Sequence, residues 1–169
     1  FIFYLLSSNF GEVLTVFIGI LIFTSTDGTS LLPLLALHIL WINLVTDGLP
    51  ALALSVDPYE DDVMEQKPRD PHEKIIPMSM FFTMLFVGVI MMVGTLLVFN
   101  YFLTDLPYAR TMAFSTLVMF QLFNVFNARS RSKSLFHSGV FSNKWLLLAV
   151  FINLEMQIVV IYTPLSFYF

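Results

Sequence analysis

The stretch WINLVTDGLPALAL (residues 41–54) places three oxygen-bearing side chains inside a long apolar run. Asn43, Thr46 and Asp47 carry an amide, a hydroxyl and a carboxylate, and a Gly-Leu-Pro sequence follows directly. In an α-helix, positions i, i+3 and i+4 lie on one face, so these side chains would form one polar stripe. A charge at the centre of a membrane helix costs about 2.5–3.5 kcal/mol, and such residues mark ion or proton pathways. The stretch therefore predicts a membrane helix with a functional polar face.

The composition places the chain among integral membrane proteins. Hydrophobic residues make up 57% of its 169 residues and charged residues 12%, whereas a globular domain has about 45–50% and about 25%. The chain has no cysteine, which excludes disulfides and thiolate metal sites. It begins at Phe1 in apolar sequence without a methionine, so we expect a piece of a longer protein.

Five apolar segments approach or exceed the roughly 20 residues that a membrane-spanning helix needs. We predict an all-α bundle of about five transmembrane helices at residues 1–23, 32–56, 78–103, 111–127 and 145–162. Pro33 is expected in the first turn of the second helix, where proline is tolerated. Pro50 lacks an N–H and clashes with the preceding turn, so we predict that this helix is broken and unwound near Gly48–Pro50, which would free backbone carbonyls.

The basic residues of the connecting loops predict the orientation of the bundle. Loops 57–77 and 128–144 hold seven Lys and Arg residues, whereas the opposite side holds Arg110 alone. Short cytoplasmic loops are enriched in Lys and Arg, so both loops are predicted to be cytoplasmic. The expected partner is a lipid bilayer. No nucleic-acid partner is expected.

Two further helices carry polar stripes like that of residues 41–54. Asn9 and Glu12 are three residues apart in the first helix, as are Gln121 and Asn124 in the fourth, so each pair shares a helix face. Polar side chains within a membrane face the bundle interior. We therefore expect the three stripes to face one another.

The facing side chains supply only oxygen ligands, which suits a hard cation. Calcium takes 6–8 oxygens at about 2.3–2.6 Å and accepts irregular geometry. The predicted cation ligands are Asn9, Glu12, Asn43, Thr46, Asp47 and Gln121. Oxygen ligands do not exclude manganese, and small polar residues can instead hold membrane helices together.

Two other polar positions lie outside this set. Glu155, with Gln157 near it, has no predicted partner and is considered for a counter-ion or proton route. His38 is predicted to be a packed or interfacial histidine rather than a ligand.

The motifs resemble those of the P-type ATPase family. SSNFGE (residues 7–12), LWINLVTDGLPALAL (40–54) and DPYEDDVMEQKPRDP (57–71) are similar in order and spacing to the calcium pumps of sarco/endoplasmic reticulum type and their bacterial relatives. MAFSTLVMFQLFNVFNARS and NKWLLLAVF follow in the expected order. The resemblance covers essentially the whole chain and implies that its helices are the fifth to ninth of such a pump.

The resemblance also implies roles for the polar residues. Asn9 and Glu12 would be cation ligands on the fifth pump helix. Asn43, Thr46 and Asp47 would be ligands on the sixth, with Asp47 shared between two calcium positions.

Gln121 departs from the family pattern, because calcium pumps usually have a glutamate ligand there. Glutamine keeps a carbonyl oxygen but loses the charge, so we expect one weakened site and one calcium per ATP. The resemblance implies that the weakened position is formed by Asn9, Glu12, Thr46, Asp47 and Gln121. The other position would use Asn43 and Asp47 together with a glutamate from the fourth pump helix, outside this chain. We therefore expect the chain alone to bind calcium weakly or not at all.

The resemblance implies ATP-driven calcium transport out of the cytoplasm by the longer protein. Its N-terminal helices and its phosphorylation, nucleotide and actuator domains would be the partners, with ATP and magnesium used by the whole pump. The family's phosphorylated aspartate motif and nucleotide site match nothing here, so the chain alone is expected to be non-catalytic. The alternatives are a manganese or sodium pump, an ion-coupled secondary transporter and a membrane scaffold. The secondary transporter would show an internal repeat, and we find none in the sequence.

Overall fold

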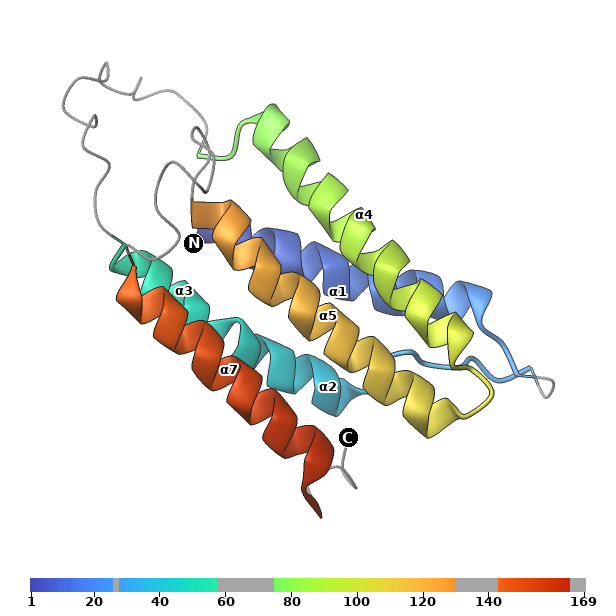
Figure 1. Ribbon diagram of the computed structural model, residues 1–169. Helices are drawn as coiled ribbons and strands as arrows, with labels where there is room; N and C mark the ends of the chain where they lie inside the picture. Colours follow the sequence, from blue (N-terminus) through green and yellow to red (C-terminus); the bar gives the residue numbers. More distant parts are fainter. Residues whose placement is uncertain (26–27, 58–74, 130–142, 165–169) are drawn as a thin grey trace.

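The computed structural model describes residues 1–25, 28–57, 75–129 and 143–164. Within these ranges, five helical spans are long and apolar enough to cross a membrane, and they run side by side as a bundle (Figure 1). The all-helical fold class predicted from the sequence is confirmed. Residues 58–74 and 130–142, on which the predicted orientation depends, lie outside the described ranges.

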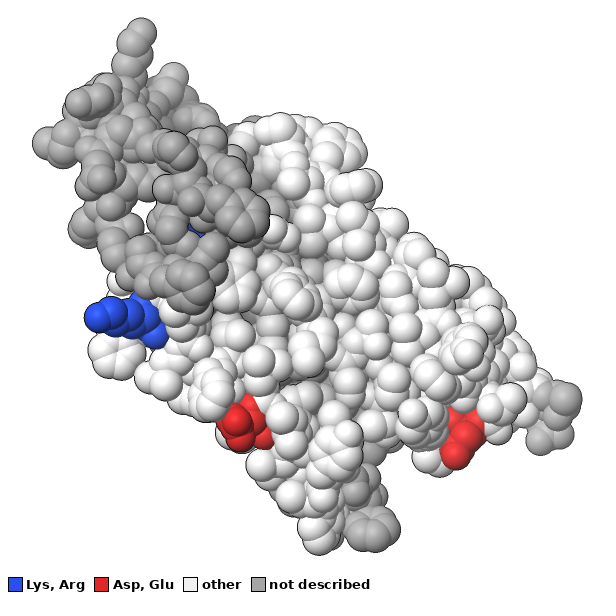
Figure 2. All heavy atoms as spheres, viewed as in Figure 1, with Lys and Arg blue, Asp and Glu red and all other residues white. Residues whose placement is uncertain are grey.

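The second span is built from three successive pieces, whereas each of the others is one α-helix. The elements are α1 (Ile2–Ile22), α2 (Ala36–Trp41), the π-helix η1 (Ile42–Thr46), α3 (Gly48–Ser55), α4 (Met78–Tyr101), α5 (Leu106–Arg129) and α7 (Lys144–Tyr162). Large apolar side chains are exposed on every span, and the described surface in Figure 2 carries very few charged atoms. Such a surface suits contact with lipid.

The second span begins later than predicted. Pro33 lies before this span rather than in its first turn. α2 starts at Ala36, and Pro33 packs against α1, where a Cβ added to Gly19 would lie 2.5 Å from the proline Cγ. Gly28, at a φ of 78°, helps to reverse the chain between the two spans, a conformation that glycine adopts freely.

α5 begins at Leu106, whereas the sequence predicted a connector through residue 110. The Asp105 side chain accepts a hydrogen bond from the backbone N–H of Tyr108 at 3.3 Å, as a helix N-cap does. Pro107 follows in the first turn, where a missing N–H has no cost. The Asp-Leu-Pro sequence is therefore a helix start that the prediction overlooked.

α1 lies against α4 along much of its length (Figure 1). A Cβ added to Gly88 of α4 would lie 2.7 Å from the Cβ of Phe10 and 3.0 Å from the backbone nitrogen of Gly11. Small residues allow membrane helices to approach this closely. The contact fixes the part of α1 that carries Glu12.

Three helix ends meet around Asp57, which follows α3. The Arg129 Nε, at the end of α5, lies 3.1 Å from both carboxylate oxygens of Asp57. The Asn143 Nδ2, at the N-cap of α7, donates to Asp57 Oδ1 at 2.9 Å and to the carbonyl of Ala53 at 3.0 Å. We call Asp57, Arg129 and Asn143 the end clamp.

Candidate cation site

The second span is interrupted by η1 directly before Gly48. The N–H of Asp47 donates to the carbonyl of Ile42 at 2.8 Å, five residues back, which is the π-helical pattern. The residues flanking η1 keep right-handed helical backbone angles. The predicted break of this helix near Gly48–Pro50 is confirmed. The backbone stays helical on both sides of the break, so the predicted unwinding is wrong. Pro50 falls in the first turn of α3, where a proline does not prevent the helix from forming.

The carboxylate of Glu12 joins three elements. Its Oε2 accepts a hydrogen bond from Asn43 Nδ2 at 2.7 Å, and its Oε1 accepts one from Gln121 Nε2 at 2.8 Å. Glu12 is 3% exposed and Gln121 is fully buried, whereas Asn43 lies on an exposed flank. α1, η1 and α5 therefore turn polar side chains toward one another, as their spacing predicted.

Asp47 is held by Tyr4, a residue that the sequence reading missed. The Tyr4 hydroxyl donates to Asp47 Oδ1 at 2.8 Å and lies 3.4 Å from the carbonyl oxygen of Thr46. All three residues are buried. Tyr4 and Glu12 are eight residues apart, close to a shared face of α1. This spacing was the signal that could have found Tyr4.

The side chains of the remaining polar residues make no hydrogen bond to Glu12 or Asp47 in the described part of the chain. Asn9 is half-buried, and its side chain has no hydrogen bond to any residue that the structure describes. Asn124 Nδ2 donates to Ser7 Oγ at 2.7 Å, one helical turn from the contact between Gln121 and Glu12. Thr46 enters the hydrogen-bond network through its backbone carbonyl.

Several buried oxygens around these contacts have no hydrogen-bond partner among the described residues. They are Asp47 Oδ2, Gln121 Oε1, Asn124 Oδ1 and Asn153 Oδ1. Buried polar atoms are nearly always hydrogen-bonded, and an exception can mark an absent ion or water. In the described part of the chain, no three His, Cys, Asp or Glu residues gather as metal ligands. A cation here would therefore rest on two carboxylates with amide and carbonyl oxygens, which suits calcium better than zinc.

The polar residues set aside in the sequence take part in none of the hydrogen bonds described above. His38 is buried, its Nδ1 accepts a hydrogen bond from the N–H of Leu35 at 3.2 Å, and its ring stacks on Phe114. The prediction of a packed histidine is confirmed. Glu155 is exposed, and Gln157 is buried with neither amide atom bonded to a described residue.

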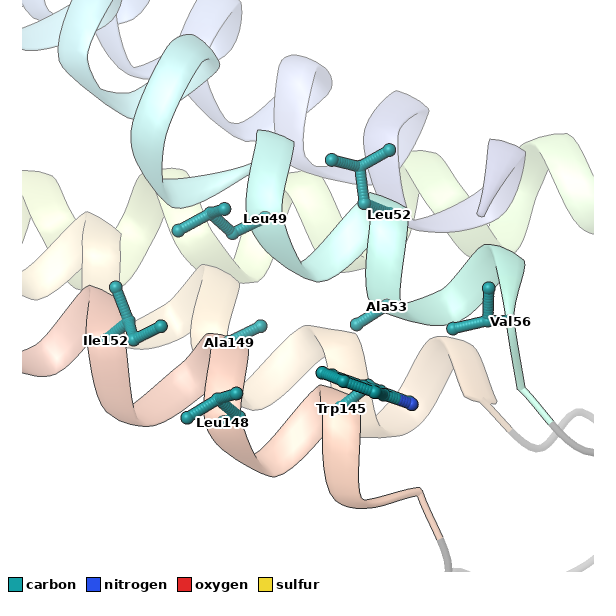
Figure 3. Close-up of a pocket in the computed structure, with 8 residues that line it drawn as sticks. All are labelled: Leu49, Leu52, Ala53, Val56, Trp145, Leu148, Ala149 and Ile152. Carbon is teal, nitrogen blue, oxygen red and sulfur yellow. The ribbon is translucent and has the colours of Figure 1, made fainter.

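A groove between α3 and α7 is distinct from the polar cluster (Figure 3). Its lining is apolar and contains none of the predicted ligands; the residues are Leu49, Leu52, Ala53, Val56, Trp145, Leu148, Ala149 and Ile152.

Comparison with known families identifies the chain. Residues 31–169 match the family described as cation transporting ATPase, C-terminus. The chain belongs to this family. The P-type ATPase resemblance that the sequence motifs indicated is therefore confirmed, and the buried carboxylate of Asp47 lies within the matched residues.

Individual members of the cation-transporting ATPase family match the chain over most of its length. It is 41% identical to calcium-transporting ATPase 1 of Bacillus cereus, covering 96% of this chain and 20% of the relative. It is 42% identical to the calcium-transporting ATPase of Bacillus subtilis, over 97% of this chain and 18% of the relative. Human calcium-transporting ATPase type 2C member 1 is 38% identical over 78% of this chain and 15% of the relative. The chain thus spans about a fifth or less of these proteins.

Proposed function

We propose that this chain is the membrane part of an ATP-driven calcium pump, to which it supplies cation ligands. The strongest support is the Glu12 carboxylate, which accepts hydrogen bonds from two amides and lies beside buried oxygens that have no partner among the described residues. The names of the calcium-transporting relatives support calcium as the ion. ATP and magnesium would act in parts of the longer protein outside this chain.

The proposed ligand set combines α1, the second span and α5. Its members are Asn9, Glu12, Asn43, Thr46, Asp47 and Gln121. Two of the six are carboxylates, and two negative charges balance one divalent cation. Because Gln121 is neutral, we propose that the pump carries one calcium ion per cycle.

Two amide groups provide a way to hold the site together without an ion. Asn43 and Gln121 each donate an N–H to Glu12. An amide also has a carbonyl oxygen, which accepts rather than donates. If each side-chain amide rotated so that its nitrogen and oxygen exchanged places, an oxygen that can ligate a cation would replace the N–H. Calcium would thus substitute for the two N–H donors at the Glu12 carboxylate.

The test uses the full-length pump and phosphorylation from ATP with calcium, manganese or sodium as the only candidate ion. We expect calcium to support phosphorylation, and the substitution Asp47→Asn to abolish it while membrane insertion persists. Phosphorylation only with manganese or sodium would assign the alternative ion. Phosphorylation that needs none of the three, or that survives Asp47→Asn, would contradict the proposed site.

Ion stoichiometry tests the role of Gln121 separately. Radioactive calcium bound per phosphorylation site should be one in the wild-type pump. Gln121→Glu adds a third carboxylate and should increase the number bound or the affinity. Two calcium ions in the wild type would contradict single-ion transport without affecting the calcium assignment.

We also propose that loops 57–77 and 128–144 face the cytoplasm, where they would meet the phosphorylation, nucleotide and actuator domains. The excess of Lys and Arg in these loops supports this orientation. The chain has no cysteine, so a single cysteine placed in either loop of a cysteine-free pump can be labelled from one side. An impermeant thiol reagent should reach it only from the cytoplasmic side, and labelling from outside would reverse the orientation.

A further inference from the structure

The backbone carbonyl of Thr46 has lost its usual donor. In an α-helix each carbonyl accepts a hydrogen bond from the N–H four residues later, and four residues after Thr46 is Pro50, which has no N–H. The next N–H, of Ala51, donates to the carbonyl of Asp47 at 3.1 Å. Because Thr46 is 1% exposed, bulk water does not replace the missing donor. A side chain must therefore satisfy this carbonyl.

The donor comes from α7. Asn153 Nδ2 lies 3.0 Å from the carbonyl oxygen of Thr46, and Asn153 is 2% exposed. The Tyr4 hydroxyl is 3.4 Å from the same oxygen but 2.8 Å from Asp47 Oδ1. A hydroxyl has one proton to donate, and the shorter contact assigns it to the carboxylate. Asn153 is then the donor on which the carbonyl depends.

Asn153 has an energetic disadvantage at its buried position, which indicates that its N–H donor is needed. The Asn153 Oδ1 is buried and has no partner among the described residues, and a buried polar atom without a partner is destabilising. A leucine of similar size would avoid that cost. Among the described residues, the hydrogen bond to the Thr46 carbonyl is the contact that favours an amide over a leucine at this position.

The Thr46 carbonyl is part of the peptide group that joins Thr46 to Asp47, at the junction of η1 and α3. Fixing this peptide plane fixes the backbone from which the Asp47 side chain extends toward Tyr4. We infer that Asn153 is a positioning residue for the cation site, through which α7 orients Asp47 although α7 carries none of the proposed ligands. The inference rests on the proposed function, since it concerns the cation affinity of that site.

The experiment measures equilibrium binding of radioactive calcium to the full-length pump carrying Asn153→Leu. A lost donor to a buried carbonyl should weaken calcium affinity about tenfold, with the number of bound ions unchanged. Asn153→Ala removes the same donor without adding bulk and should give the same shift if the leucine variant does not fold. The matched control is Gln157→Leu, which removes another buried amide of α7 and should leave affinity within about twofold.

Pro50→Ala separates the carbonyl from other effects of Asn153. Alanine restores an N–H that can donate to Thr46 within the helix, so Asn153→Leu should cost much less affinity in the Pro50→Ala background. Wild-type affinity in both Asn153 variants would overturn the inference. An equal loss in Gln157→Leu, or an Asn153→Leu effect that Pro50→Ala does not reduce, would also overturn it. Wild-type protein that binds no calcium would instead refute the proposed function.

Discussion

Tyr4 supplies the hydrogen bond that Asp47 receives inside the bundle, at 2.8 Å. Tyr4→Phe keeps the ring and removes that donor, which leaves both oxygens of a buried carboxylate without one among the described residues. We expect this to lower the stability of the calcium-free protein by about 1–3 kcal/mol. The melting temperature in detergent should fall accordingly.

Calcium should compensate for the missing hydroxyl, because an ion bound to Asp47 would itself provide a partner. The rise in melting temperature on adding calcium is thus expected to be larger in Tyr4→Phe than in wild type. Tyr101→Phe, at a position 79% exposed, is the matched control and should melt like wild type. Identical melting of the two variants would show that Tyr4 does not support Asp47.

At single positions the sequence identified the proposed ligands better than the residues that hydrogen-bond to them or to their backbone. Glu12, Asp47 and Gln121 could be found because a carboxylate or amide in an apolar helix is conspicuous and helical spacing shows which side chains share a face. Helical spacing could place Tyr4 near the face of Glu12, but it could assign a partner to neither Tyr4 nor Asn153. Their importance depends on which atom each one faces in another helix, and the Asn153 partner is a backbone carbonyl, which no side-chain pattern displays.

At the scale of helices, α1 and α4 pack so closely at Gly88 that a side chain there has no room. A Cβ there would meet the Cβ of Phe10 at 2.7 Å and the backbone of Gly11 at 3.0 Å, and backbone atoms cannot rotate away. Gly88→Ala should therefore separate the two helices and destabilise the protein by about 1–3 kcal/mol. The measurements are the melting temperature and the yield of monodisperse protein in detergent.

Gly48→Ala is the contrasting variant for this prediction. The nearest atom to an added Cβ there is the carbonyl oxygen of Asn43, at 4.0 Å. Gly48 begins α3, and alanine favours a helix over glycine by roughly 0.5–1 kcal/mol. We expect this variant to melt no lower than wild type. If Gly48→Ala were the more damaging of the two, the steric argument for Gly88 would fail.

The helices themselves were largely predictable, and their ends show where prediction stopped. The long apolar runs of α1, α4 and α7 specified those spans to within about two residues. Pro33 was predicted in the first turn of the second helix, but it lies before α2 and packs closely against Gly19 of α1, a contact that the sequence pattern does not show. The π-helical hydrogen bond to Ile42 was also not predictable, because no residue type or spacing in the sequence marks the extra residue of a π turn.

At the scale of the whole molecule, the end clamp joins α3, α5 and α7 at one end of the bundle. The side chains of Arg129 and Asp57 are 7% and 20% exposed, so their ion pair is shielded from most of the solvent. Asp57→Asn removes the charge that faces Arg129, and the loss of a shielded pair should cost about 1–3 kcal/mol. Lower thermal stability is expected in detergent and in lipid nanodiscs.

Lys144→Gln is the control for this prediction, since Lys144 is an exposed cation at the start of α7. Its neutralisation should leave the melting temperature unchanged. A double variant, Asp57→Asn with Arg129→Gln, should lose less than the sum of the two single losses, because the residues act as a pair. Strictly additive losses would mean that the clamp does not couple its helices.

The π-helix also determines which genetic changes the site can survive. A π-helical hydrogen bond encloses one residue more than an α-helical one, so η1 holds a residue that a regular helix between α2 and α3 would not need. Deleting one residue there, such as the outward-facing Leu44, would give a more regular helix with both ends still in place. Asn43 and Asp47 would become three positions apart, and Thr46 would leave their shared face. One lost codon could thus remove the proposed cargo site and spare the fold, an outcome that no scan of substitutions would reveal.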